Sequence, residues 1–400
     1  MSATSPQTLL ERINLSDATR ADHSDVVATR RHLHTMPEVG LEEFETAKYI
    51  AARLTQLGIQ HQQCTPTGLA ALLESGKGGP VVMLRSDIDA LPITEENTHE
   101  YVSRRPGFMH ACGHDTHIAM LLGVARRLKS EGLQHGTVKL VFQPGEEGHH
   151  GASKMVEAGV MEHPHVDVAY GQHVWAQAPV GQILIEEGPV MAAVDRIHIT
   201  ITGKGTHAAY PHGGHDPIYC AAQMITALQS IVSRNIDPLQ PAVVTISMIS
   251  AGTAHNIIPP TCEMTGTVRV FDAETHGIIR RRIEEISDGI ARTLGCEARL
   301  DYLPEHVPVV NDARIAAIVR EEAVAIVGAS NVLANQKTMG AEDMSDFLKL
   351  VPGAYAFIGA QNKDKGCFYP HHHPKFNIDE DALAIGAELM YRVAQRLLKT

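Results

Sequence analysis

The sequence predicts an α/β protein whose mostly parallel or mixed sheet is flanked by helices and interrupted by a smaller α+β domain. Three observations support this fold class. A chain of 400 residues is longer than one hydrophobic core usually supports. Apolar strand-like runs alternate with helical runs before Gly188, as in a parallel sheet covered by helices. After Gly188 the pattern changes to the polar/apolar alternation of half-exposed strands.

The first part of the chain alternates between helices and buried strands. The first ~20 residues show no clear periodicity, which is typical of a loosely attached segment. Helices are expected at 24–34, 41–57 and 116–129. Strands are expected at 81–88, 137–143 and 166–174, because each is an apolar run of the length of a buried strand.

The later part of the chain predicts an insertion and a return to the first domain. Between Gly188 and Tyr302, four strands and two helices are expected, with strands at 197–203, 242–250, 262–271 and 297–302 and helices at 217–233 and 273–294. The last segment has helix–strand–helix patterning and ends in a helix at 380–398. We therefore expect a main domain made of residues 20–187 and 303–400, and a satellite domain made of residues 188–302.

Composition restricts the possible partners and location. Lys and Arg number 34 against 46 Asp and Glu, a net charge of -12, which disfavours a nucleic acid or an anionic membrane as partner. The six cysteines lack paired spacing, as in a reduced protein. The start of the chain shows no basic flank followed by an apolar run, so we expect a cytoplasmic protein. The 24 histidines are more than a core needs.

The densest chemical signal lies at residues 109–123, MHACGHDTHIAMLLG. A cysteine, three histidines and an aspartate precede an apolar helix, and these are the ligand types that a borderline divalent ion prefers. Cys112 and His114 are two residues apart, so a loop rather than a helix must bring them together. Asp115 or Thr116 is expected to cap the helix that follows. The sequence therefore predicts a metal site, although each histidine alone could be merely exposed.

Carboxylates follow two of the predicted strands. Glu146 and Glu147 come after 137–143 and a Pro-Gly turn, and adjacent carboxylates at a strand end can take different roles. One can bind a metal while the other accepts a proton from water. Asp87 and Asp89 end the strand at 81–88 and are expected to orient metal-binding histidines. Because functional groups gather at the carboxyl ends of parallel strands, we expect one site here.

Histidines supply the remaining candidates. His173 follows the apolar strand at 166–174, and three consecutive histidines, His371 to His373, precede Pro374 and the last helix. A histidine-rich loop alone could be a surface patch. Together with the other clusters it indicates a further metal ligand.

The motifs HACGHDxH, QPxEEG, GxHVW, GxGxHAAxP, AHNIIP and HHPKF occur in this order. Their set resembles the hippurate hydrolase branch of the aminoacylase-like metallopeptidases, which also holds N-acyl-amino-acid amidohydrolases and indoleacetyl-amino-acid hydrolases. The resemblance covers about residues 25–395. It implies a zinc-peptidase-like catalytic domain with two metals and an inserted ferredoxin-like satellite domain that forms a homodimer, or a dimer-based tetramer.

The resemblance implies a role for each matching residue. The metal ligands would be five side chains: Cys112, His114, Glu147, His173 and His372. His372 is chosen because the ligand of the family lies two residues before the proline, with His371 and His373 as alternatives. Glu146 would be the general base. Asp87 stands where the wider family has histidine, so Asp87 and Asp89 are read as supporting residues, as is Asp115.

The satellite domain would contribute to substrate binding. His207 matches the histidine that reaches the scissile carbonyl, often from the partner subunit, and would stabilise the oxyanion. Asn256 and Arg269 resemble positions that hold the substrate carboxylate, while Arg234 is a weaker candidate. Glu342 and Asp343 belong to another motif of the family, GAEDMSDF, without an assigned role.

These features predict a metal-dependent amidohydrolase that cleaves N-acyl-L-amino acids, a small-molecule substrate. Two divalent ions, Mn²⁺ or Zn²⁺ with Co²⁺ or Ni²⁺ as further options, would activate a water whose proton passes to Glu146. Two alternatives stay open: a thiol amidase with Cys112 as nucleophile, and a non-catalytic metal-binding protein.

Overall fold

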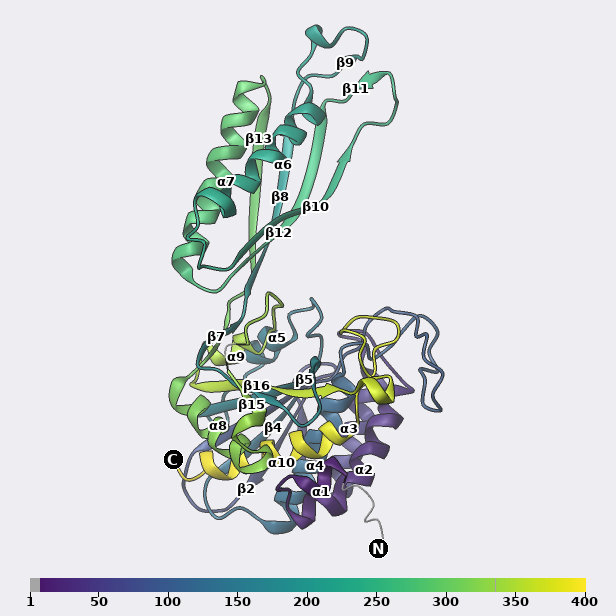
Figure 1. Cartoon of the computed structure of the whole chain (residues 1–400), viewed down its shortest axis with the longest axis vertical. Helices are drawn as coiled ribbons and strands as arrows, with labels where there is room; N and C mark the ends of the chain where they lie inside the picture. The colour runs from purple at the N-terminus through teal and green to yellow at the C-terminus, as the bar shows by residue number, and fades with distance from the viewer. Residues whose placement is uncertain (1–7, 335) are drawn as a thin grey trace, which may run out of the picture. The chain divides into compact units, whose positions relative to one another are not determined.

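The computed structural model describes residues 8–334 and 336–400, which fall into two compact units (Figure 1). The first unit holds the described residues of Met1–Gly188, Val310–Gln336 and Asp343–Thr400. The second unit holds Pro189–Val309 and Lys337–Glu342. The border that the sequence predicts at residue 302 falls inside a strand, β13 (Glu297–His306).

A mixed eight-stranded sheet forms the centre of the first unit. Its strands are β1 (Gln60–Gln63), β2 (Leu69–Glu74), β3 (Val81–Asp87), β4 (Thr137–Gln143), β5 (Val168–Pro179), β6 (Ile183–Leu184), β15 (Val332–Leu333) and β16 (Gly353–Gln361). Their order is β1-β2-β4-β3-β5-β16-β6-β15. The central strands β4, β3, β5 and β16 run parallel to one another, whereas β2 and β6 pair antiparallel at either side of them, so the sheet is mixed and the predicted fold class is confirmed.

Helices cover this sheet. They are α1 (Leu9–Arg12), α2 (Asp17–His34), α3 (Phe44–Gln56), α4 (His114–Glu131), α5 (Gly151–Glu157), α8 (Ala313–Val327), α9 (Ser345–Leu348) and α10 (Asp381–Leu397). α10 packs on α2, α4 and α8 in one layer, whereas α5 and α9 contact each other (Figure 1). β3 is buried along its whole length, because helices cover the sheet on the faces toward which its side chains point.

The prediction that the first ~20 residues are loosely attached is wrong for the described residues from 8 onward. α2 begins at Asp17, where the hydroxyl of Ser16 accepts a hydrogen bond from the Thr19 amide as an N-cap. Leu15 is buried, and the Asn14 amide donates to the Ile326 carbonyl at 2.9 Å. The polar first turns of α2 hide its periodicity from a hydrophobicity-based reading. Residues 1–7 lie outside the described residues.

The second unit has a four-stranded antiparallel sheet. Its strands are β8 (Ala193–Thr202), β10 (Ala242–Ala251), β12 (Thr261–Val270) and β13, in the order β10-β12-β8-β13. Helices α6 (Pro217–Arg234) and α7 (Ala273–Thr293) follow β8 and β12. This βαββαβ order with antiparallel neighbours is the ferredoxin-like arrangement that the sequence predicts.

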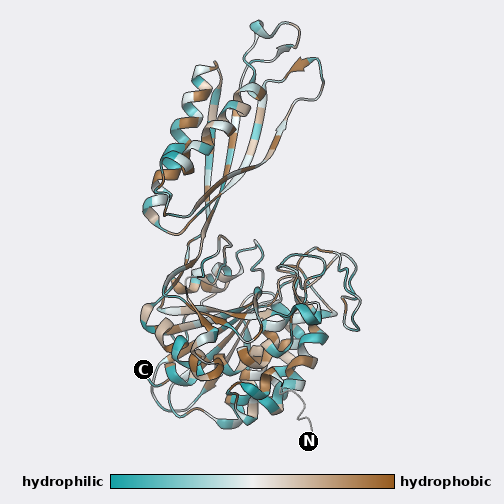
Figure 2. Cartoon of the chain, viewed as in Figure 1, coloured by the Kyte–Doolittle hydropathy of each residue, from teal (hydrophilic) through white to brown (hydrophobic). Residues whose placement is uncertain are grey.

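The core of the second unit follows the expected periodicities. In β8 the isoleucines at 197, 199 and 201 are all buried, since alternate residues of a strand share one face. Along α7, hydrophobic and hydrophilic stretches alternate (Figure 2), and its buried residues include Ile279 and Ile283.

The remaining elements are short. β9 (Thr206–His207) pairs with β11 (Ile257–Ile258), and β7 (Gly188–Met191) pairs with β14 (Val309–Asn311). The 3-10 turns are η1 (Pro211–Gly213), η2 (Ala329–Asn331) and η3 (Lys363–Lys365). Across the described ranges, none of the helices combines the length and the apolar character needed to cross a bilayer.

Candidate metal centre

Cys112 and His114 are brought together by the turn that starts α4. Gly113 is the N-cap of α4 with a φ of 95°, and a Cβ at this position would lie 2.7 Å from Cγ2 of Val174. Only glycine fits this left-handed, crowded position without strain. The predicted caps are therefore wrong: Gly113 caps the helix, and the Thr116 amide donates to its carbonyl.

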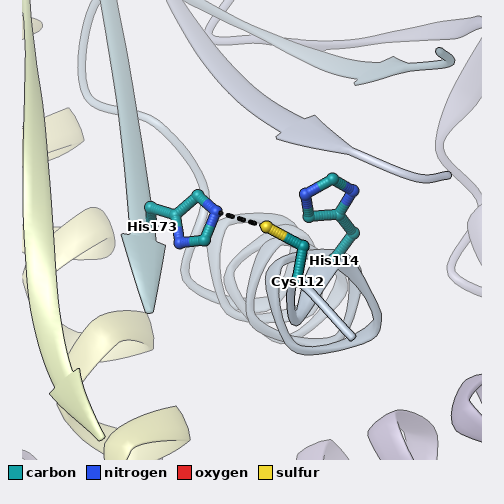
Figure 3. A group of neighbouring side chains, drawn as sticks. All are labelled: Cys112, His114 and His173. Atoms are coloured by element: carbon teal, nitrogen blue, oxygen red, sulfur yellow. Dashed lines mark hydrogen bonds between the residues drawn. The ribbon is translucent and has the colours of Figure 1, made fainter. Parts of the chain in front are cut away.

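His173 faces Cys112 from the neighbouring strand (Figure 3). Its Nε2 lies 3.4 Å from the Cys112 sulfur, while its Nδ1 lies 2.5 Å from the Val174 carbonyl oxygen and donates to it. That bond leaves the lone pair of Nε2 toward the thiol. Burial lowers the pKa of His173 well below its ordinary value, so the ring stays neutral, as a metal ligand must be. β5 continues past the predicted strand end at residue 174 to Pro179, so His173 lies inside the strand.

His114 is oriented by a carboxylate. Its Nδ1 lies 2.9 Å from the Asp89 carbonyl oxygen and 3.1 Å from Asp89 Oδ1. The opposite nitrogen, Nε2, is buried without a hydrogen-bond partner among the described residues. A metal-binding histidine commonly shows this arrangement, with one ring N–H held by a carboxylate and the other nitrogen available.

Asp89 also holds the second carboxylate motif. Its Oδ2 accepts a hydrogen bond from the Glu147 amide at 2.9 Å, so one side chain positions both His114 and Glu147. The turn between β4 and α5 thus presents Glu146 and Glu147 beside the histidine. Asp89 thus contacts two candidate ligands, and its role in orienting them stays a prediction.

The three consecutive histidines have different surroundings. His371 is half-buried, and its Nε2 accepts the Ala176 amide at 3.1 Å. His373 stacks on Tyr369 with ring centroids 4.5 Å apart, and its Nδ1 accepts the Lys375 amide. His372 is half exposed and has its Nε2 3.1 Å from Oε1 of Glu147. His372 is therefore the member of the run that faces the other candidate ligands.

The backbone of His372 fixes this orientation. Its φ is 66°, which is uncommon for a residue other than glycine, and its amide donates to the Ala111 carbonyl at 2.9 Å. The bond attaches the loop before α10 to the loop that carries Cys112.

The candidate ligands form overlapping groups. Ligand atoms lie within 4.8 Å of one another in three sets: Cys112 with His114 and His173, Cys112 with Glu147 and His372, and His114 with Glu146 and Glu147. Cys112, His114 and Glu147 each belong to two of these sets. A thiolate, three imidazoles and carboxylates fit a pair of borderline divalent ions.

The charges around this centre suit a cation. Burial alone would lower the pKa of His114, but the carboxylates of Asp87 and Asp89 raise it to about 10. Burial and the charges of Glu147 and Glu146 raise the pKa of the Cys112 thiol well above its usual value. The protein thus concentrates negative charge where a cation would neutralise it, and holds the thiol protonated until one arrives.

Asp87 and Asp115 have other partners. Burial opposes ionisation of Asp87, but the charges of His114, His117 and Arg85 lower its pKa well below the usual value. Oδ1 of Asp87 lies 2.5 Å from Nδ1 of His117, and its Oδ2 accepts from Arg85 at 2.7 Å. Asp115, expected to support a ligand, instead binds Nε of Arg30 at 2.9 Å and Nδ1 of His34 at 2.8 Å. Asp115 therefore fixes the start of α4 to α2.

The sequence marked His117 and Asp343 but did not assign the contacts by which they support the site. His117 accepts the Val174 amide on Nε2 at 3.0 Å and so holds β5 next to His173. Asp343 accepts from Arg85 and Gln143, at 2.8 Å each, and from the Ala152 amide at 2.9 Å. Asp343 thereby joins β3, β4 and α5. Two signals were available: His117 lies three residues after His114, and residues three apart share a helix face, while Asp343 belongs to the motif GAEDMSDF.

The predicted substrate-binding residues lie in the second unit. His207 is exposed in β9, and the Asn256 carbonyl accepts the Ala208 amide at 2.9 Å, so His207 and Asn256 are close neighbours. Arg269 lies on β12 opposite Val194 of β8, at the other end of the sheet. Its Nε donates to Thr267 Oγ1 at 3.1 Å, and burial lowers the pKa of Arg269. Arg234 ends α6 and is exposed.

Comparison with known proteins connects this arrangement to a family. Residues 83–396 match Peptidase family M20/M25/M40. The chain is 40% identical over 375 residues to the N-acetyl-L-cysteine deacetylase of Bacillus subtilis (strain 168), an alignment that covers 93% of this chain and 88% of that protein. It is 45% identical over 295 residues to the N-acyl-L-amino acid amidohydrolase of Geobacillus stearothermophilus, covering 72% of this chain and 78% of that protein.

Two further likenesses extend over almost the whole chain. The IAA-amino acid hydrolase ILR1-like 4 of Arabidopsis thaliana is 40% identical over 392 residues, covering 96% of this chain and 88% of that protein. Among solved structures, the Bacillus subtilis YXEP protein, described as a dinuclear metal binding peptidase, superimposes with a TM-score of 0.83 at 34% identity. That superposition covers 95% of this chain and 99% of the other.

Proposed function

Because the chain belongs to Peptidase family M20/M25/M40, we propose that this hydrolase cleaves N-acyl-L-amino acids into a carboxylic acid and a free amino acid at a two-metal centre. One observation carries the proposal. Five side chains of ligand type, from four separate segments, converge around Cys112 and Glu147, with a second carboxylate, Glu146, beside them. A metal carrier would have no need of that extra carboxylate.

The residues of the first unit would divide the work. Cys112, His114, Glu147, His173 and His372 would hold the ions, and Asp89 would orient His114 and Glu147. Bound divalent ions would lower the pKa of a water toward about 7 and polarise the amide carbonyl. Glu146 would take the proton of the attacking water and deliver it to the leaving amine.

The second unit would recognise the substrate. His207 would donate a hydrogen bond to the oxygen that becomes negative in the transition state. Asn256 and Arg269 would bind the carboxylate of the amino acid. Relatives named for N-acetylcysteine, N-acyl-amino-acid and IAA-amino-acid hydrolysis support this substrate class. Within that class we place the chain in the hippurate hydrolase branch, acting in the cytoplasm as a homodimer or a dimer-based tetramer.

The metal is proposed as Mn²⁺ or Zn²⁺, with Co²⁺ and Ni²⁺ as alternatives. The thiolate favours a borderline ion, and the imidazole and carboxylate set also suits Mn²⁺. The structural neighbour described as dinuclear supports the number of ions. The thiol amidase alternative is disfavoured, because burial and neighbouring carboxylates raise the pKa of the Cys112 thiol and so oppose a thiolate nucleophile.

Chelation tests this function. N-acetyl, N-benzoyl and N-indoleacetyl amino acids would be assayed before and after dialysis against a chelator, and again after each of the four ions is added. We expect activity to disappear with the metal and to return with Mn²⁺ or Zn²⁺. Hydrolysis by fully metal-free protein would refute the proposal and favour the thiol enzyme.

The general base is tested by Glu146→Gln. The amide keeps the size of the side chain but cannot accept the proton of water, so kcat should fall by about 10²- to 10⁴-fold. Metal content, measured by elemental analysis, should stay at the wild-type value because Glu146 is not the proposed ligand. Wild-type turnover in this variant would exclude Glu146 as the base.

A further inference from the structure

The turn that presents the paired carboxylates lacks the support of regular structure. It lies between the end of β4 at Gln143 and the start of α5 at Gly151, and it contains Gly145 and Gly148 with φ values of 58° and 76°. The turn has two backbone bonds of its own, from the Gly148 amide to the Glu146 carbonyl at 2.7 Å and from the Gly151 amide to the Gly145 carbonyl at 3.1 Å. These local bonds shape the turn, but bonds to side chains of other segments attach it to the rest of the unit and so fix where Glu146 and Glu147 lie.

Two carboxylates supply such bonds. Asp89 accepts the amide of Glu147, as described above. Glu43 accepts the amide of Gly145 on Oε1 at 2.7 Å, one residue before Glu146. The two bonds hold the turn from either side of Glu146. Asp89 belongs to the metal centre, but Glu43 lies before α3 and is not in any of the three sets of candidate ligands described above.

The side chain of Glu43 bonds to the Gly145 amide and does not cap α3, the helix that follows it. It is the N-cap residue of α3, yet its side chain makes no capping bond to the described first turn. Its other oxygen, Oε2, accepts the hydroxyl of Thr67 at 2.7 Å. Both acceptors are therefore used on segments outside α3.

The environment of Glu43 is costly for a carboxylate. The side chain is completely buried, and the two donors named above carry no charge. Burial raises its pKa to about 7. A buried acid at this cost would be easily replaced if it only filled space, since an apolar residue of the same size avoids the desolvation penalty.

We propose that Glu43 is a positioning residue that holds the general base Glu146 in place by accepting the Gly145 amide. This inference rests on the function proposed above. The shared turn also bears the ligand Glu147, but Glu147 has its own bond from Asp89. Loss of Glu43 should therefore displace the base more than it disturbs the metal.

The test compares Glu43→Ala and Glu43→Gln in the metal-loaded enzyme, with N-acetyl and N-benzoyl amino acids as substrates. Glu43→Ala should lower kcat by about 10- to 100-fold, because a displacement of about 1 Å can cost this much. Its KM and its metal content should match the wild type. Glu43→Gln should restore most of kcat, since the amide oxygen can still accept from Gly145 while its NH₂ faces the Thr67 hydroxyl.

Glu38→Ala is the matched control. Glu38 is another buried glutamate of the same segment, but it accepts the Thr46 amide and hydroxyl at 2.8 and 2.9 Å and pairs with Arg105. Glu38→Ala should lower the melting temperature at least as much as Glu43→Ala does. Its kcat at 25 °C should match that of the wild type.

Three results would overturn the inference: wild-type kcat in Glu43→Ala with a lowered melting temperature only, an equal loss of kcat in Glu38→Ala, or parallel loss of metal and kcat. An inactive wild type with every metal would instead refute the proposed function, and this would be apparent before any variant is compared.

Discussion

His371, His372 and His373 show how one residue type takes three roles through its contacts. His371 accepts the backbone amide of Ala176, His373 stacks on an aromatic ring, and His372 reaches Glu147. Sequence alone offers three equivalent candidates, and the choice of His372 came from its distance to Pro374. The contacts separate the three because Nε2 of His372 lies 3.1 Å from the candidate ligand Glu147, whereas Nε2 of His371 and Nδ1 of His373 accept backbone amides.

His372→Ala should therefore remove a metal ligand, whereas His373→Ala should not. Mutation of a residue that only supports a metal ligand typically lowers metal affinity by about 10- to 100-fold. Loss of the ligand itself should therefore lower the affinity for one ion by more than about 100-fold. Elemental analysis after gel filtration would show about one ion fewer per chain for His372→Ala. The opposite result, with metal lost only from His373→Ala, would reassign the ligand.

The pKa of Glu43 makes stability depend on pH. Burial raises this pKa to about 7, from about 4.3 for an exposed glutamate. The folded state then binds the proton more tightly than the unfolded state, so stability from this group is complete below about pH 4 and is lost as the pH rises through 7. Gln at this position has no such dependence.

In metal-free protein, the free energy of unfolding of Glu43→Gln relative to that of the wild type should therefore increase as the pH rises from 4.5 to 8. The increase should reach about 3 kcal/mol. Urea unfolding of both proteins at several pH values measures this difference. A difference that stays constant with pH would show that the carboxyl titrates normally.

At the scale of elements, burial decides how well the sequence predicts a boundary. β4 begins and ends at the predicted residues, because a short apolar run between turn residues is unambiguous. β5 runs five residues past its predicted end, since its last part alternates buried and exposed residues and includes Trp175, Gln177 and Pro179. The start of α2 was missed because its first turns are polar and their capping depends on a side-chain bond from Ser16.

The first turn of α4 carries the element-scale prediction. Gly113→Ala combines a left-handed φ with a Cβ 2.7 Å from Val174 Cγ2, so unfolding free energy should fall by about 2–4 kcal/mol. Gly366→Ala, after the 3-10 turn η3, is the control. Its φ of 76° and ψ of 7° are also left-handed, but no atom lies within 4 Å of the added Cβ, so only the backbone cost of about 1–2 kcal/mol should appear.

Urea unfolding gives both values, and metal content should fall in Gly113→Ala alone, because the turn places Cys112 and His114. Equal losses in the two variants would mean that Val174 gives way and that the turn tolerates a side chain.

For the whole molecule, local signals predicted which residues could bind metal but not what supports them. Cys112, His114, Glu146 and Glu147 stand in short motifs, so their chemistry is visible in the sequence. The bonds from Arg85 to Asp343 and from Asp115 to His34 join residues 258 and 81 positions apart. No spacing rule predicts such pairs. The resemblance assigned a role to His207 and Arg269, and the structure adds how far apart these two residues lie within the second unit.

That distance has a consequence for assembly. Arg269 lies opposite Val194, whereas His207 follows the far end of the same sheet, where Thr261 pairs with Thr202 (Figure 1). Along β12, the eight residue-to-residue steps from Thr261 to Arg269 span roughly 26 Å. An N-acyl amino acid is much shorter than that. If both residues bind one substrate, they must come from two copies of the chain.

Mixed dimers test this requirement. In a dimer of one His207→Ala chain and one Arg269→Ala chain, one site would receive intact Arg269 from its own chain and intact His207 from the partner, while the other site would lack both. Random mixing makes half of the dimers mixed, so co-expressed variants should recover about a quarter of wild-type activity although each alone is nearly inactive. As a control, a chain that carries both substitutions should recover no activity. Failure of the two single variants to complement, with mixed dimers demonstrated by tagged purification, would show that each site takes its His207 and Arg269 from one chain or does not use both.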